Sequence, residues 1–343
     1  MELSTLGRNR IPLISAGVCL AALVGVLMTV GNQATHEIHF VQELISPGFL
    51  FVVVMCVWLI RNPKTMIPLQ AIVFLCLFPV IGTVCRTALH IEDLALPLRW
   101  DAVLCRIDNA LGIAPAWIVG YRFGHGFSRI LLQHVYDLWI LMLVICWVVN
   151  RARADGRAKG LLKSYALNLM AGWSLFLLLP ANGPGFAFPG YPTVVPHPDL
   201  ALISVRGLAN SIPSLHMSGA LILVAHAARS RNWRGIFVLN AIGTAMATLA
   251  LGEHYLIDLV VAVPFACFAV NMIDQRWRRG FCALASVLTW MFAIRWFAPV
   301  LVDHGAIIWV AAALTLIGCW WLKPERRLPE IKSPALVPSC QSL

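Results

Sequence analysis

The sequence is poor in charged residues, and this deficit limits the class of protein that it can encode. Only 12% of the 343 residues are Asp, Glu, Lys or Arg, whereas about a quarter are charged in a typical soluble domain. Hydrophobic residues make up 59% of the chain, and the mean hydropathy is +0.79. Because so many apolar side chains need lipid around them, the composition excludes a soluble globular protein and predicts an integral membrane protein.

Other absences exclude further classes of site. The chain has ten cysteines but no C-x-x-C pair, and most of them lie inside apolar runs, so we expect neither a disulfide framework nor a cysteine metal site. No internal repeat or low-complexity tract is visible. The net charge of +10 does not indicate a nucleic-acid partner, because the basic residues lie in short loops between apolar runs.

Most of the chain consists of apolar stretches separated by short polar segments. Ten of them, some weak, approach the roughly 20 residues that a helix needs to cross the hydrocarbon core. They lie near residues 11–31, 44–60, 66–90, 130–150, 161–180, 212–229, 235–252, 254–273, 281–301 and 305–322. The first has no small-residue cleavage site, so we interpret it as a span rather than a signal. The predicted fold class is all-α, a polytopic protein of about ten transmembrane helices.

Loop charges predict the orientation in the bilayer. Most of the 26 lysines and arginines fall in alternate loops, and these residues concentrate on the cytoplasmic side of membrane proteins. We therefore expect both termini in the cytoplasm. The outer face would then carry residues 31–43, 91–129, 181–211 and 302–304.

The same pattern predicts five regions. We expect N-terminal transmembrane helices over 1–98, an outer-face interfacial or re-entrant segment over 99–129, catalytic core helices over 130–273, a transmembrane hairpin over 274–322 and a cytoplasmic tail over 323–343. The second region is too polar to span, yet its apolar residues recur at roughly helical spacing. The tail is rich in proline and basic residues, which favours disorder.

Two polar clusters lie at the ends of predicted spans, where convergent polar residues indicate a functional site. The first runs from Asn210 to His216 and opens the sixth span, and the second runs from Glu253 to Asp258 and opens the eighth. One span down and one span back separate the two histidines, His216 and His254. Both should therefore reach the same face of the bilayer.

The spacing within the second cluster favours nucleophilic catalysis. His254 and Asp258 are four residues apart, so on a helix they share a face, and the carboxylate can accept the proton of one imidazole nitrogen. The other nitrogen is then left basic, as in a nucleophile oriented by an acid. The second imidazole, His216, can protonate a leaving oxygen. We predict phosphoryl transfer by two histidines and an aspartate.

Other readings of these histidines remain open. A histidine in a membrane helix is often an interhelical hydrogen-bond partner, which is our interpretation of His134 and His226. Two histidines and Asp258 are also a possible zinc site with one open position. A carboxylate one turn after a histidine suits an orienting role as well, so we predict no metal and no cofactor.

The ordered motifs resemble a known family. Pro213-Ser214-Leu215-His216 followed by His254-Tyr255-x-x-Asp258 is similar to the type 2 phosphatidic acid phosphatase superfamily, in particular to its inositol phosphorylceramide synthase-like branch. The resemblance covers roughly 99–273 and includes Asp101, Asp108, Leu111-Gly112 and Tyr136. It implies a six-helix catalytic core, with His254 as a nucleophile that forms a phosphohistidine, Asp258 as its orienting acid and His216 as acid and base on the leaving group.

The chain departs from the phosphatase branch in its cations. It has no Lys-x6-Arg-Pro motif, and Ala247 and Thr248 stand where that branch carries a Ser-Arg pair. A phosphate still needs donors in a low-dielectric site. Arg206 and Arg86 are the best candidates to supply the missing cations. The alternative for Arg206 is a simple headgroup contact, and the alternative for Arg86 is a structural role. The full set of predicted substrate-binding residues is Arg206, Ser211, Ser214, Asn182, Arg86 and Tyr255.

These observations favour an enzyme of lipid metabolism. The leading hypothesis is a phosphotransferase that moves a phosphate-bearing headgroup from a phospholipid donor to a lipid alcohol acceptor at the outer face of the membrane. The alternative within the same chemistry is a phosphatase acting on a lipid phosphate or a polyprenyl diphosphate. A transporter is a third hypothesis, which the absence of inverted repeats disfavours. Nothing in the sequence indicates an oligomeric state.

Overall fold

The structure is a computed structural model. It describes residues 51, 53–62, 65–152, 157–207, 209–227 and 231–322. The first predicted span, the predicted tail over 323–343 and both termini lie outside these residues.

The described elements are almost all helices. In chain order they are α3 (Ile67–Ala95), β1 (Leu98–Arg99), α4 (Asp101–Ala110), α5 (Pro115–Phe123), α6 (Gly126–Asp137), α7 (Trp139–Ala152), α8 (Arg157–Phe176), α9 (Pro184–Ala187), β2 (Ile203–Ser204), α10 (Leu215–His226), α11 (Arg231–Ala250), α12 (Leu256–Ile273), α13 (Trp277–Asp303) and α14 (Gly305–Leu322). The two short strands pair antiparallel, with Arg99 opposite Ile203.

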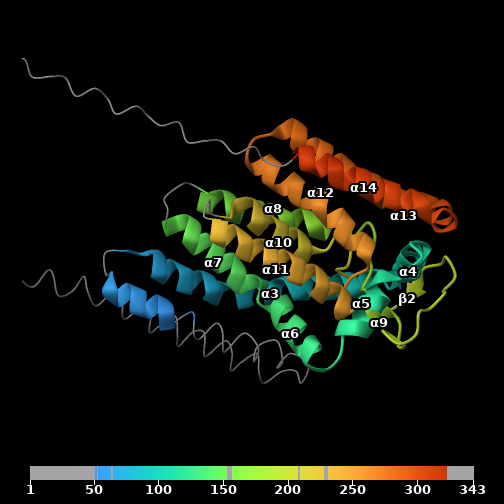
Figure 1. The fold of residues 1–343 in the computed structure, drawn as a ribbon, viewed down its shortest axis with the longest axis horizontal. Helices are drawn as coiled ribbons and strands as arrows, with labels where there is room; N and C mark the ends of the chain where they lie inside the picture. The colour runs from blue at the N-terminus through green and yellow to red at the C-terminus, as the bar shows by residue number, and fades with distance from the viewer. Residues whose placement is uncertain are drawn as a thin grey trace, which may run out of the picture.

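Helix α12 forms the centre of the fold. It is the most apolar of the candidate spans, and two thirds of it is buried inside the protein. It packs against α8, α10, α13 and α14 along its length and against α4 near its start. The long helices lie side by side, whereas α4, α5, α9 and β2 gather at one end (Figure 1). The start of α12 therefore faces the non-helical loops at that end.

Several helices suit a membrane. Within the described ranges, three helices are long and apolar enough to cross a bilayer: Asn232–Ala250, Leu256–Ile273 and Trp277–Asp303. The count rises to five if each of two bent helix pairs is one span. These features confirm a mostly helical protein with apolar helices of membrane-spanning length, while the count of ten remains a prediction.

The predicted outer-face segment 99–129 contains one of the bent pairs. Helices α4 and α5 meet at 90°, the geometry of a broken span or a re-entrant loop. Helix α4 is short but carries two buried carboxylates, Asp101 and Asp108. Asp108 accepts hydrogen bonds from the backbone N–H groups of Leu256 (3.1 Å) and Ile257 (3.4 Å). It thereby caps the first turn of α12, where backbone donors have no partner within the helix.

This cap generates a prediction about stability. Replacing Asp108 with alanine leaves the Leu256 and Ile257 amides buried without an acceptor, and we expect a loss of about 2 kcal/mol in the free energy of unfolding. Asp108→Asn keeps one acceptor oxygen and should lose less. Thermal unfolding of the detergent-solubilised protein, followed by circular dichroism, measures both. An alanine variant as stable as the parent would show that Asp108 does not hold α12.

Candidate active site

Asp258 lies in the first turn of α12 and His254 lies just before it. Tyr255 is the N-cap residue of the helix and has extended backbone angles, so His254 is outside the helix. The spacing in the sequence predicts the His254 and Asp258 side chains on one helix. The capping turn brings them together instead, with His254 Nδ1 3.4 Å from Asp258 Oδ2. Both side chains are buried.

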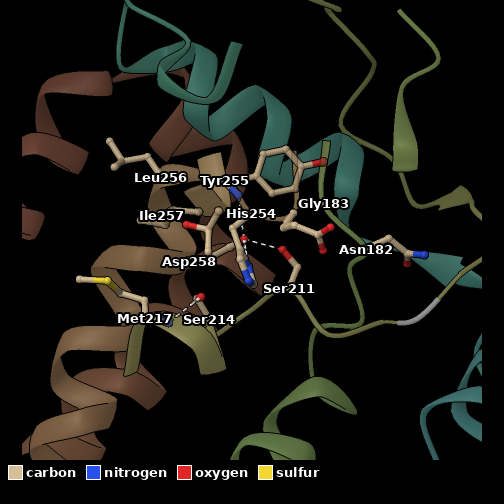
Figure 2. A network of polar contacts seen from close by, with 12 residues as sticks. Asn182, Gly183, Ser211, Ser214, Met217, His254, Tyr255, Leu256, Ile257 and Asp258 are labelled. Carbon is tan, nitrogen blue, oxygen red and sulfur yellow. Dashed lines mark hydrogen bonds and ion pairs between the residues drawn. The ribbon is translucent and has the colours of Figure 1, made fainter. Parts of the chain in front are cut away.

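Asp258 is held by other donors as well. Its Oδ2 accepts the Ser211 hydroxyl and the backbone N–H of Tyr255, the latter at 2.9 Å. Asp258 Oδ1 and His254 Nδ1 have no hydrogen-bond partner among the described residues. The His254 ring lies beside Asp258 and Ser211 (Figure 2). The imidazole and the carboxylate are thus in ion-pair range, while the carboxylate itself is fixed by neighbouring groups.

His216 is the second residue of α10, and the start of that helix is tied to α12. Ser214 caps α10 by accepting the Met217 N–H at 3.3 Å, and the Ser214 N–H donates to the Asp258 carbonyl at 3.4 Å. His216 is close enough to His254 for the two imidazoles to interact electrostatically. The structure therefore brings together His216, His254 and Asp258, the three residues that the sequence predicts as catalytic.

Two aromatic rings surround His216. The Tyr136 ring stacks on the imidazole with 3.9 Å between ring centroids, and Trp139 meets it edge-on at 5.6 Å. The Tyr136 hydroxyl donates to Glu253 Oε2 at 3.4 Å. Burial raises the pKa of the Glu253 carboxyl, and the charge of His254, the Tyr136 hydroxyl and the charge of Arg129 act in the opposite direction.

The matched part of the chain contains all of these residues. Residues 102–272 match the model of the PAP2 superfamily. This segment is a PAP2-superfamily domain. The chain matches no curated protein and no solved structure. Membership indicates an enzyme of the phosphatase or phosphotransferase type.

Three residues predicted to bind substrate form hydrogen bonds with other residues of the protein. Ser211 donates to Asp258, and Ser214 caps α10. Tyr255 is fully buried, and its hydroxyl donates to Asp101 at 3.0 Å. Their side chains thus position other parts of the site in the structure described, which differs from the direct substrate contact that the sequence suggests.

The structure describes the other three predicted substrate residues to different extents. The Asn182 side chain points away from His254 and Asp258 (Figure 2) and is buried, with no hydrogen-bond partner among the described residues. Arg206 is exposed in the loop that follows β2. Arg86 lies in α3, but its side chain is outside what the structure describes. Among the described side chains, neither Asn182 nor Arg206 forms a hydrogen bond or an ion pair with the histidine pair, and the role of Arg86 stays a prediction.

A glycine-rich loop packs directly against the segment that carries His254. Asp101 accepts the backbone N–H groups of Asn182 and Gly183 at about 3 Å, which fixes the loop. Gly183 has φ +102°, and a Cβ there would lie 2.3 Å from the Glu253 carbonyl oxygen. Only glycine allows this approach. The glycine-rich loop thus supports the backbone beside His254.

Sequence reasoning gave no role to Glu253, Tyr136 or Arg129. The available signal for Glu253 was its place next to His254, as an acidic residue at the end of an apolar run. Tyr136 was singled out only through the family resemblance. Arg129 gives no sequence signal for this site, because it lies in another helix and acts on Glu253 only through space.

The Ser211 contact generates a second prediction. Ser211→Ala removes a hydrogen bond to a buried carboxylate, so Asp258 should orient His254 less well, and kcat should fall about tenfold. KM for a lipid phosphate should stay within twofold, because the Ser211 hydroxyl is engaged by Asp258. Ser218→Ala is the matched control, since Ser218 is a buried serine of α10 whose hydroxyl donates to the Leu215 carbonyl within the helix. A rise in KM with kcat unchanged would return Ser211 to a substrate-binding role.

Proposed function

We propose that the protein is a membrane lipid phosphotransferase that acts through a phosphohistidine on His254. One observation carries this proposal: a buried imidazole lies 3.4 Å from a buried carboxylate, with a second imidazole within electrostatic range. The PAP2 match supports the phosphatase or phosphotransferase class. The proposal includes a six-helix core within about ten spans, an active site at the outer face and both termini in the cytoplasm, as the loop charges predict.

The first half-reaction forms the covalent intermediate. His254 Nε2 attacks phosphorus while Asp258, on the Nδ1 side, stabilises the charge that develops on the imidazole. A bond forms between nitrogen and phosphorus, and the bond between phosphorus and the leaving lipid oxygen breaks. His216 donates a proton to that oxygen, so the lipid leaves as an alcohol.

The second half-reaction transfers the group. His216, now neutral, takes the proton of an acceptor hydroxyl as its oxygen attacks the phosphohistidine. The phosphorus–nitrogen bond breaks, and His254 is regenerated. A lipid alcohol as acceptor gives a transferase, and water gives a phosphatase. The burial of His254 and Asp258 favours the transferase, because a site that excludes water suppresses hydrolysis.

The acceptor assignment follows the branch that the motifs resemble. Within the superfamily, we assign the chain to the inositol phosphorylceramide synthase-like branch, on the basis of the missing Lys-x6-Arg-Pro motif and the His254-Tyr255-x-x-Asp258 order. The donor is then a phospholipid and the acceptor a lipid alcohol. No nucleic acid takes part.

A test of the nucleophile uses purified protein and a phospholipid donor labelled in its headgroup. His254→Ala should lose the covalent phosphoryl adduct and all turnover, while His134→Ala should keep both, because the His134 ring bonds the Ile130 carbonyl within its own helix α6. Label should pass to an added lipid alcohol in the parent protein. Release of a free phosphate-bearing headgroup at the same rate with and without acceptor would establish the phosphatase instead.

The phosphate needs a cation, and Arg206 is our proposal for it. Its side chain is exposed in the loop that leads to Ser211, so it is free to meet a headgroup at the outer face. Arg206→Ala should raise KM for the phospholipid donor about tenfold, the effect of one lost charge-assisted contact, with kcat nearly unchanged. Arg122→Ala, which removes another exposed arginine, is the control. Equal KM values for the two variants would exclude Arg206 as the phosphate contact.

A further inference from the structure

The orientation of His216 depends on two aromatic side chains from the junction of α6 and α7. Tyr136 belongs to the last turn of α6 and covers one face of the imidazole at 3.9 Å, with 26° between the ring planes. Trp139 begins α7 and stands edge-on to the same ring, at 80°. The two helices bend by 48° between these residues. Contacts on a face and on an edge restrict the tilt and the rotation of the imidazole.

Tyr136 also contacts the segment that carries the nucleophile. Its hydroxyl donates to Glu253 Oε2, and Glu253 directly precedes His254. The backbone of Glu253 is itself supported by the close approach of Gly183, and its N–H donates to the Thr248 carbonyl at 3.0 Å. A single tyrosine therefore connects the imidazole of His216 with a supported backbone position next to His254.

We propose that Tyr136 and Glu253 form a positioning pair that sets the orientation of His216 relative to His254. The inference rests on the proposed function, because it assigns the pair to the proton-transfer step of that reaction. Neither residue touches the reacting atoms in this role. The pair acts by keeping a nitrogen of His216 within hydrogen-bond reach of the leaving oxygen, which general acid catalysis requires.

The chemistry of the leaving group separates this role from a merely structural one. An alkoxide is a poor leaving group and needs the proton of His216, whereas 4-nitrophenolate leaves without one. Loss of positioning should therefore slow the cleavage of an alkyl phosphate strongly and the formation of phosphohistidine from 4-nitrophenyl phosphate little. Breakdown of the phosphohistidine also needs His216, as a base, so the intermediate should accumulate.

The experiment compares a monoalkyl phosphate with 4-nitrophenyl phosphate on the full-length protein in detergent, each with the same lipid alcohol present as acceptor. Tyr136→Leu, which removes the ring and the hydroxyl, should lower kcat for the alkyl phosphate about 10²-fold, within the usual contribution of a general acid. The first burst of 4-nitrophenolate should change less than threefold, and more acid-quenched phosphohistidine should be present at steady state. His216→Ala provides the reference for complete loss of the acid.

Two conservative variants test the two contacts separately. Tyr136→Phe keeps the stacked ring and loses the bond to Glu253, so its defect should be smaller than that of Tyr136→Leu. Glu253→Gln keeps an oxygen that accepts the tyrosine hydroxyl and should rescue most of the activity that Glu253→Ala loses. Both conservative variants preserve side-chain volume, so they keep the proposal testable if Tyr136→Leu does not fold.

Phe237→Leu is the matched control. Phe237 is a fully buried ring of α11 that stacks on Trp233 and contacts neither histidine. It should affect both substrates equally. If the variants of Tyr136 and Glu253 slow the formation of phosphohistidine from the two substrates by the same factor, the positioning pair is wrong while the proposed function stands. If His254→Ala retains the burst, or His216→Ala shows no dependence on the leaving group, the proposed function itself is wrong.

Discussion

The site depends on the donors that hold three buried carboxylates around the start of α12. Asp101, Asp108 and Asp258 are all fully buried, and a carboxylate in such surroundings is stable only where hydrogen-bond donors compensate for the lost water. The donors here are backbone N–H groups and two hydroxyls from separate parts of the chain. Satisfying the three acids therefore brings the glycine-rich loop, the start of α12 and the loop before α10 together. The catalytic geometry follows from this requirement.

Asp258 combines two roles that are usually assigned to different residues. It accepts the Tyr255 N–H in the capping box of α12, and it faces His254 Nδ1 with the same oxygen. The N-terminal end of a helix favours a negative charge nearby, so the start of α12 suits a carboxylate at this position. His254 lies just before the helix, beside this carboxylate. The orienting acid is therefore as rigid as the helix start.

Sequence patterns predicted the parts of this arrangement that depend on local spacing and on the order of helices. The pairing of His254 with Asp258 was correct although the assumed helix was not, because a capping turn also brings residues four apart together. The proximity of His216 followed from one helix down and one back. Spacing does not encode the direction of a side chain, so it does not reveal that Ser211 and Tyr255 donate to Asp258 and Asp101. Their contact with substrate stays a prediction. The contact between Tyr136 and Glu253 joins residues 117 apart, which no local pattern reveals.

The side chains around His254 differ in their exposure, and this difference bears on the side from which a substrate can approach. His254 and Asp258 are buried, whereas His216, Tyr136, Trp139 and Glu253 are partly exposed. In the proposed reaction, a substrate phosphate approaches His254 from the side of His216. Because an in-line displacement places the leaving oxygen opposite the attacking nitrogen, that oxygen then points toward His216. In the same proposal, the acceptor hydroxyl takes the place of the leaving lipid. The proposal needs one imidazole in one orientation for both half-reactions, and a ring restrained on a face and on an edge meets that need.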